Sequence, residues 1–236
     1  LPASLLRARR LVAVSRHIQN SLARAWPFCR GKLRVVHEGV DLDRFGPGED
    51  AGRRTDGYLL FVGTLFPYKN VDLVLRALAR LRANDHRTSL RLKIAGKDVK
   101  GRYFGPLRRL ADDLGVAEAV DWLGPVDHER MPELYQGAAA LLYPSAVESF
   151  GLPALEAMAC GVPVVASCRG ALPEVVGDAG MLVEPEAEPL ADATERVLRD
   201  AELRRSLVRR GRTRASRFTW RATARQMLEI LTDCCD

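Results

Sequence analysis

From Tyr58 onward, short apolar runs alternate with segments of helical periodicity, and this alternation constrains the fold more than any other feature. Apolar runs of this length, bounded by turn residues, are typical of buried strands. We predict strands over Tyr58 to Val62, Leu90 to Ala95, Ala119 to Leu123, Ala138 to Tyr143, Val162 to Ala166 and Gly180 to Val183. Because strands joined by helices form parallel sheets, we expect an α/β, Rossmann-like fold with helices on both faces of the sheet.

The segments between these runs carry helix signals. Apolar residues from Val71 to Leu81 recur at helical spacing, and Asn70 stands where an N-cap is expected. Pro153 suits the first position of another helix, which ends at Gly161. Further helices are predicted over Tyr103 to Leu114, His128 to Gln136, Pro173 to Gly177, Leu190 to Leu198 and Leu203 to Arg210, and in a final helix capped by Thr219.

The first 45 residues have a different pattern. Leu11 to Val14 and Leu33 to Val36 are predicted to be short strands, the first of them buried, and Ser15 is expected to cap a helix from Arg16 to Ala25. Two strands and one helix cannot bury a core of their own. They therefore pack on the rest of the chain or form the last unit of an upstream domain.

Composition limits the classes of function. The chain has 236 residues, 47% of them hydrophobic, which is enough for a sizeable core. Its net charge of +6 reflects arginine, which is dense from Arg196 to Arg225. These arginines would either form a solvated helix face or bind an anionic membrane surface. A nucleic-acid interface is disfavoured, because aromatic residues at 6% are too few for base stacking.

Five irregularly spaced cysteines argue against a disulfide framework and against a zinc site of CxxC pairs. We therefore expect reduced thiols in the cytoplasm.

No apolar run approaches the roughly 20 residues that span a bilayer. The sequence also lacks the GxGxxG fingerprint and the GxxxxGK[ST] phosphate loop. His37 and His128 lie near strand ends, but neither is paired for metal binding.

Two loops follow strands of the predicted sheet and carry candidate site residues. Lys69 lies in the loop after the first strand, and Glu148 and Glu156 flank a loop and helix start after the fourth. Ligands of open α/β sheets bind outside the carboxyl ends of the strands. A lysine and helix-start N–H groups suit a diphosphate, and carboxylates suit sugar hydroxyls. The alternative is that these are ordinary solvated side chains.

The residues around these two loops resemble the sequence pattern of a known family. The run from Tyr143 to Ala166 has Glu148 and Glu156 in E-x7-E spacing, with Phe150-Gly151-Leu152-Pro153 between them and Cys160-Gly161-Val162-Pro163 after them. With Gly63-Thr64-Leu65, Lys69-Asn70 and Trp122 to Val126 upstream, it resembles the retaining GT-B glycosyltransferases called glycosyl transferases group 1. This large family includes bacterial mannosyl- and glucosyltransferases and relatives of glycogen synthase.

The resemblance implies roles. Glu148 would act beside the donor sugar, and Lys69 would neutralise the diphosphate leaving group, which makes these two the catalytic candidates. Glu156 would bind the ribose hydroxyls. The other implied donor-binding residues are Thr64, Ser149, Phe150, Gly151, Leu152 and Val126. No metal or other cofactor is expected, because the cation and helix-start dipoles would stabilise the leaving group.

The sequence departs from the family pattern at the basic residues. Thr64 and Tyr68 stand where members usually carry an arginine, so a diphosphate cation is missing or comes from elsewhere. Arg169 and Lys97 are the candidates for its replacement. Glu38 stands where the family usually has an asparagine.

The resemblance also implies an arrangement of domains. Residues 1–45 would be the end of an N-terminal acceptor domain with the hinge, and 46–57 a glycine-rich linker. Residues 58–200 would be the nucleotide-sugar-binding domain, and 201–236 C-terminal helices that cross back toward the missing N-terminal domain.

The expected activity is retaining transfer of a hexose from a nucleoside-diphosphate sugar, with GDP-mannose weakly favoured as the donor, in polysaccharide biosynthesis. Acceptors of the family are glycans, lipid-linked sugars or small molecules. The expected partner is an N-terminal domain or partner subunit, and the location is cytoplasmic or peripheral at the inner membrane face. The alternative is a non-catalytic nucleotide-sugar-binding or scaffolding module.

Overall fold

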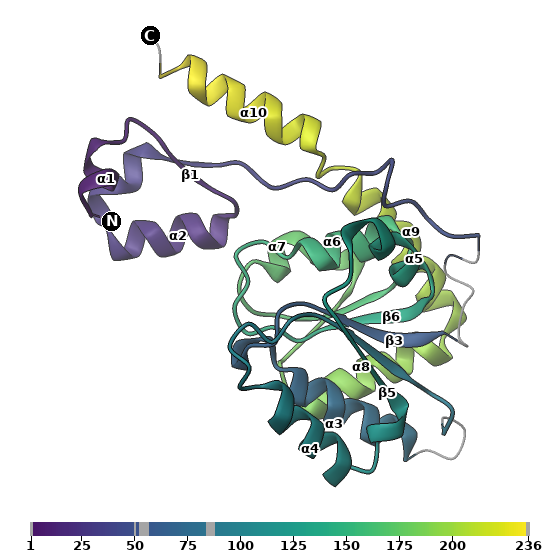
Figure 1. Ribbon diagram of the computed structural model, residues 1–236. Helices are drawn as coiled ribbons and strands as arrows, with labels where there is room; N and C mark the ends of the chain where they lie inside the picture. Colours follow the sequence, from purple (N-terminus) through teal and green to yellow (C-terminus); the bar gives the residue numbers. More distant parts are fainter. Residues whose placement is uncertain (1, 50, 52–56, 84–87, 235–236) are drawn as a thin grey trace.

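A six-stranded parallel sheet organises most of the chain (Figure 1). The computed structural model describes residues 2–49, 51, 57–83 and 88–234. The strand order is β5-β4-β3-β6-β7-β8. The strands are β3 Tyr58–Val62, β4 Leu92–Ala95, β5 Val120–Gly124, β6 Ala138–Tyr143, β7 Val164–Ser167 and β8 Met181–Val183. All six predicted strands are present, and the predicted α/β, Rossmann-like fold is confirmed.

The central strands are buried on both faces, which is why they read as continuous apolar runs. In β3, Leu59 and Phe61 pack on one side, while Leu60 joins the hydrophobic cluster on the other. Helices α3, α4 and α8 cover the first side, and α5, α6, α7 and α9 lie over the second (Figure 1). Their bounds are α3 Val71–Arg82, α4 Phe104–Asp113, α5 Met131–Gln136, α6 Leu152–Ala159, α7 Leu172–Val176, α8 Ala187–Arg199 and α9 Ala201–Ala215.

The first residues form a separate small unit. Strands β1 (Leu11–Ala13) and β2 (Leu33–Val35) pair in their own two-stranded parallel sheet, beside α2 (Arg16–Ala25). A short helix, α1 (Pro2–Arg7), precedes them without a signal that we recognised in the sequence. The expectation of a buried first strand is only partly met, because Val12 is 38% exposed. Within the predicted linker 46–57, residues 50 and 52–56 lie outside the described residues.

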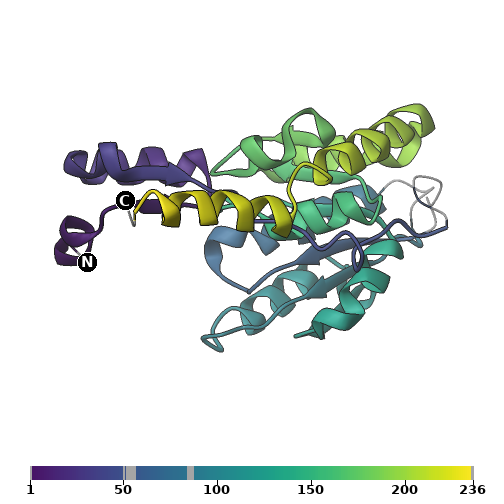
Figure 2. The ribbon, with the colours of Figure 1, turned by 90° about the horizontal axis from the view of Figure 1, so that it is seen from above.

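Helix α10 (Trp220–Thr232) returns to this small unit rather than to the large sheet (Figure 2). The helix has no buried residue, and the apolar face expected for it stays open: Trp220 is 50% exposed and Leu228 is 65% exposed. None of the helices among the described residues has the length and apolar character needed to cross a membrane.

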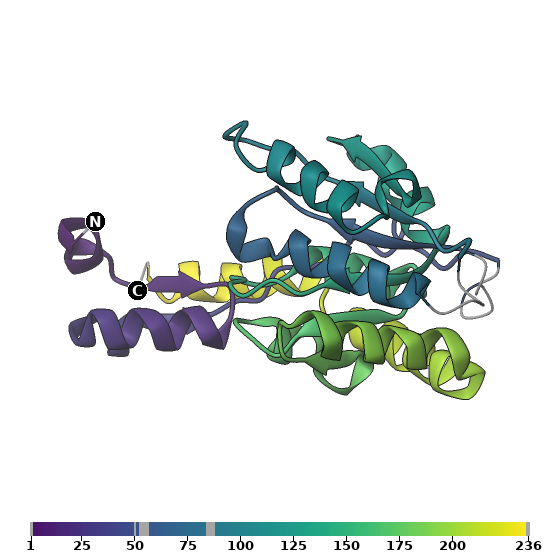
Figure 3. The same ribbon diagram turned by 90° about the horizontal axis from the view of Figure 1, so that it is seen from below.

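Two chain segments cross between the small unit and the large sheet, and they run together. Val40 donates its N–H to the Phe218 carbonyl and forms an isolated parallel bridge with Thr219. A Cβ at Gly39 would lie 2.2 Å from the backbone nitrogen of Trp220, so only glycine fits there. Viewed from below, the small unit projects beyond the layers of helix and sheet (Figure 3).

The strand order defines where a ligand crevice can form. From β3 the chain proceeds to β4 and β5 on one side, and from β6 it proceeds to β7 and β8 on the other. Between β3 and β6 the direction of winding reverses, and such a switch point opens a crevice outside the carboxyl ends of the strands. The loops that leave β3 and β6 are those that carry Lys69 and Glu148.

Three predicted helix caps have different outcomes. Ser15 and Thr219 accept hydrogen bonds from the N–H groups of Ile18 and Ala222, as expected. The prediction for Asn70 is wrong in its mechanism: α3 begins after it, but its side chain makes no capping hydrogen bond. Helix α6 begins at Leu152, so that Pro153 is its second residue rather than its first.

Candidate functional site

The loops after β3 and β6 are tied directly to each other. The N–H of Ala146 donates to the Tyr68 carbonyl at 2.7 Å, and the Asn70 side-chain amide donates to the Pro144 carbonyl at 2.8 Å. This contact explains why Asn70 does not cap α3. The residue adopts a left-handed conformation with φ 55°, and its side chain forms a hydrogen bond with the neighbouring loop instead. Asparagine is one of the few residues that tolerate this conformation. The two loops therefore form one surface at the switch point.

Lys69 and Glu148 form an ion pair at the centre of this surface. Their Nζ and Oε1 atoms are 2.5 Å apart, and the side chains are only 11% and 9% exposed. The Lys69 ammonium also donates to the Tyr143 hydroxyl at 3.4 Å. Since an ammonium has three N–H donors, a further one stays available for an anionic ligand. The two catalytic candidates thus lie together, although 79 positions separate them in the chain.

Glu156 lies one helical turn into α6 and has a different partner. It accepts a hydrogen bond from the Tyr135 hydroxyl at 2.8 Å. Burial raises the pKa of the Glu156 carboxyl, while the Tyr135 hydroxyl and the nearby His128 oppose that shift. The two carboxylates of the E-x7-E pattern therefore have separate surroundings, one holding a cation and the other a phenol.

Between the two glutamates, the backbone offers donors. Within the described part of the chain, the N–H groups of Phe150, Gly151 and Leu152 have no protein acceptor. Gly151 has φ 113°, and a Cβ there would lie 2.8 Å from the Leu172 side chain, so glycine is required. Free N–H groups at the start of α6, with the positive end of the helix dipole, suit a phosphate or carbonyl oxygen.

The remaining predicted residues are distributed around this centre. Thr64 follows β3, and its neighbour Leu65 donates an N–H to the Lys97 carbonyl. Ser149 is exposed and its carbonyl accepts from the Ser15 hydroxyl at 2.7 Å. Val126 lies apart, after β5. The candidate replacement cations do not meet the pair: Arg169 points to Glu184 at 2.6 Å and Lys97 is exposed.

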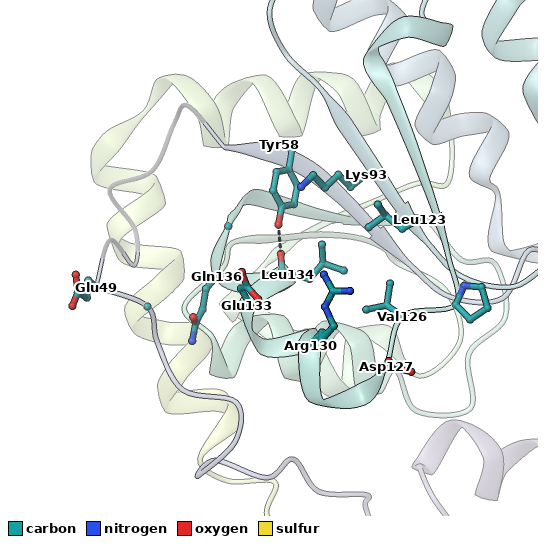
Figure 4. A pocket seen from close by; sticks show the side chains of 13 residues that line it. Glu49, Tyr58, Lys93, Leu123, Val126, Asp127, Arg130, Glu133, Leu134 and Gln136 are labelled. Atoms are coloured by element: carbon teal, nitrogen blue, oxygen red, sulfur yellow. Dashed lines mark hydrogen bonds between the residues drawn. The ribbon is translucent and has the colours of Figure 1, made fainter.

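A cavity lies beside this centre rather than in it (Figure 4). It measures about 660 Å³ and runs over the sheet face next to α5, where Val126 and Arg130 line it. The Lys93 ammonium in its wall lies 4.0 Å from the centre of the Tyr58 ring. A second cavity of about 480 Å³ opens at the carboxyl ends of β4 and β5, between Lys97 and Trp122. Lys69, Glu148 and Glu156 line neither cavity.

Sequence reasoning missed several residues that shape the centre. Tyr143 and Tyr135 are apolar-pattern positions of a strand and a helix, and nothing in the pattern says that their hydroxyls meet Lys69 and Glu156. Burial raises the pKa of both phenols well above the ordinary value, and the nearby carboxylates add to the shift, so both stay protonated. Among the described residues, no group of three or more His, Cys, Asp or Glu side chains could hold a metal ion.

The sheet order and its switch point define a Rossmann-like α/β domain, with a buried lysine–glutamate pair at the crevice. A family model described as "Glycosyl transferases group 1" matches residues 49–214. The chain belongs to this glycosyltransferase family.

The curated relatives of the chain are longer proteins. It is 40% identical over 216 residues to the D-inositol 3-phosphate glycosyltransferase of Acidothermus cellulolyticus, covering 86% of this chain and 48% of the relative. The chain thus spans about half the length of the curated relatives it matches.

Solved structures agree on the fold. Sucrose-phosphate synthase from Thermosynechococcus elongatus superposes with a TM-score of 0.85 at 31% identity, over 98% of this chain and 60% of that protein. Anabaena HepE, solved with UDP and glucose, gives 0.88 at 22% identity, over 98% and 65%.

The buried pair makes a first prediction. Replacing Lys69 by Met leaves the Glu148 carboxylate buried without a cation, and we expect the free energy of unfolding in urea to fall by about 3 kcal/mol. Adding Glu148→Gln to Lys69→Met should restore most of that loss, because neither charge then remains.

The control is Arg80→Met, which breaks the Arg80–Glu188 pair on the surface, with side chains 52% and 68% exposed. It should cost less than about 1 kcal/mol. If Lys69→Met costs no more than this control, the Lys69–Glu148 pair is not a buried interaction of the folded protein.

Proposed function

We propose that this chain is the donor-binding half of a retaining glycosyltransferase that transfers a hexose from a nucleoside-diphosphate sugar. The observation that carries the proposal is the Lys69–Glu148 pair at the switch point, next to the free N–H groups of residues 150–152. In this proposal the diphosphate lies against Lys69 and those N–H groups, and Glu148 faces the sugar. Charge grows on the diphosphate as the glycosidic bond breaks, and a cation already in place stabilises that charge.

Glu156 completes the donor site in this proposal by accepting hydrogen bonds from the ribose hydroxyls. The base would lie toward the 480 Å³ cavity and the backbone near Val126. The donor is a hexose nucleotide: the Gly63-Thr64-Leu65 and Lys69-Asn70 pattern favours GDP-mannose, and the UDP of the HepE structure favours a uridine nucleotide. No metal or other cofactor enters the proposal, because Lys69 and the helix start supply the positive field.

The acceptor would be bound by an upstream domain or a partner subunit that packs on the small unit. This is supported by the half-length coverage of the relatives. Exposed apolar residues of the small unit and of α10 are also consistent with such packing. They are Leu6, Val12, Phe28, Trp220, Leu228 and Leu231, all at least 38% exposed. The relatives' names favour a phosphorylated polyol as the acceptor, and glycans and lipid-linked sugars are the other classes of the family.

The proposed location is the cytoplasm, and the arginines of α9 and α10 favour peripheral contact with the inner membrane face. The described cysteines Cys29, Cys160, Cys168 and Cys234 are free, which suits a reducing compartment. A second candidate function is a non-catalytic nucleotide-sugar-binding or scaffolding module, favoured by Thr64 and Tyr68 in place of a basic residue.

Calorimetric titration of UDP, GDP and ADP into the purified chain tests the proposal. We expect one of them to bind with a Kd below about 1 mM, and Glu156→Ala to weaken that binding about tenfold through loss of the ribose contact. Glu188→Ala, an exposed acid on α8, should leave it unchanged. Glu148→Gln should reduce the advantage of the hexose-bearing donor over the bare nucleotide. Absence of binding by all three nucleotides would overturn the donor site.

The pKa of Glu156 predicts a dependence on pH. Because burial raises this pKa above the ordinary value of 4.5, protonation on acidification begins at a higher pH than for an exposed glutamate. In that pH range the Glu156 carboxylate becomes protonated and no longer accepts hydrogen bonds from both ribose hydroxyls, so nucleotide affinity should fall.

The same titrations with Glu156→Gln isolate this effect from the titration of the nucleotide's own phosphate. The difference in affinity between wild type and variant should shrink as the pH falls. A difference that stays constant down to the ordinary pKa of glutamate would contradict the role of Glu156.

A further inference from the structure

Glu174, on α7 of the large sheet, holds the start of a helix that belongs to the small unit. Its carboxylate accepts from the N–H of Arg16 at 3.0 and 2.9 Å and from the N–H of His17 at 3.3 Å. A carboxylate at a helix N-terminus is favoured by the unpaired N–H groups and by the helix dipole. Glu174 also lies 2.6 Å from His37 Nε2, and its side chain is only 19% exposed. Helix α2 is thereby fixed to the donor-binding domain.

The same end of α2 also contacts the loop from Glu148 to Leu152, which we call the donor loop. Ser15 accepts from the N–H of Ile18 as the cap of α2, and its hydroxyl donates to the carbonyl of Ser149 at 2.7 Å. Ser149 lies between Glu148 and Phe150, so this hydrogen bond holds the peptide that follows the catalytic candidate. Movement of α2 away from Glu174 would remove the donor to Ser149.

A cluster of three rings makes a second connection. The His37 ring lies 5.9 Å from the ring of Phe150 and 5.4 Å from that of Phe218, and the two phenylalanines are 5.7 Å apart. His37 belongs to the first crossing segment and Phe218 to the second. Thr223, at the start of α10, donates its hydroxyl to the His37 carbonyl at 2.8 Å. Both crossing segments therefore contact the donor loop at Phe150. One of these contacts is made by His37, which also binds Glu174.

The backbone around Glu148 is packed so closely that such contacts fix its position. A Cβ at Gly170, where φ is 63°, would lie 2.8 Å from the backbone nitrogen of Glu148. The N–H of Ala171 donates to the Glu148 carbonyl at 3.1 Å, three residues before Glu174. The donor loop is thus held from the α7 side by Ala171 and from the small unit by Ser15.

We propose that Glu174 is a positioning residue of the donor site, which couples the orientation of the small unit to the conformation of the loop from Glu148 to Leu152. Glu174 touches neither Lys69 nor Glu148 and acts through Ser15, His37 and Phe150. The effect of this coupling on sugar transfer rests on the proposed function. In that case, closure of an acceptor-binding domain would change the position of Glu148, which faces the sugar. The coupling itself exists without a ligand, so it can be tested without one.

Amide hydrogen exchange followed by NMR provides the test. The N–H groups of Ala154 and Leu155 donate to the Gly151 carbonyl and report on the donor loop, without contact with Glu174. In Glu174→Gln, which keeps the shape and removes the charge, we expect these two amides to exchange at least about fivefold faster, while core amides of β3 keep their rates. Ser15→Ala should have the same effect from the other side of the contact. The matched control is Glu188→Gln, which replaces an exposed acid on α8. It should change the exchange rates neither of Ala154 and Leu155 nor of β3.

Two results would overturn the coupling. The first is faster exchange at Arg16 and His17 alone, with wild-type rates at Ala154 and Leu155, which would make Glu174 a helix cap and no more. The second is a uniform acceleration that includes β3, which would show a general loss of stability. Addition of UDP or GDP forms a separate arm: in wild type the nucleotide should slow exchange at Arg16 and His17, and Glu174→Gln should abolish this. If neither nucleotide binds, the donor site fails, whereas the ligand-free rates still decide the role of Glu174.

Discussion

The ion pair between Lys69 and Glu148 is the interaction on which the rest of the site depends. A lysine and a glutamate that are each about one-tenth exposed are stable in that position only as partners, because either charge alone would lose its hydration without compensation. The pair forms only because β3 and β6 are neighbours, so that the loops after them share one crevice. Asn70 and Ala146 then join the two loops by hydrogen bonds, and Gly151 lets the backbone turn into α6.

Much of this arrangement could be predicted from the sequence. The apolar runs located every strand of the large sheet, since strands buried on both faces carry no polar side chains to interrupt them. The same runs placed Lys69 and Glu148 in loops at strand ends, and the family resemblance then implied their roles. The sequence did not predict that they form a pair with each other, because strand order is a property of the whole sheet and not of any local segment.

Other features were beyond local reasoning for a related reason. Asn70 was expected to cap α3, since its position and residue type fit that role. Its amide instead binds Pro144, a residue far away in the chain whose approach depends on the pairing of β3 with β6. Glu174 belongs to the family pattern, but its contact with α2 could not be predicted, because the N–H groups from which it accepts hydrogen bonds belong to a helix of the other unit. Polar contacts between units, such as those of Glu174 and Ser15, are made by single residues without periodicity, so no sequence pattern predicts them.

The 660 Å³ cavity beside Lys93 and the Lys69–Glu148 pair are two different candidate sites for a nucleotide, and the position of a bound nucleotide decides between them. A crystal structure of the chain with UDP or GDP is the most direct measurement. We expect the β-phosphate within hydrogen-bonding distance of Lys69 Nζ and of the N–H groups of residues 150–152, with the ribose hydroxyls at Glu156. A nucleotide bound instead in the 660 Å³ cavity beside Lys93 and Arg130, with the Lys69–Glu148 pair untouched, would contradict it.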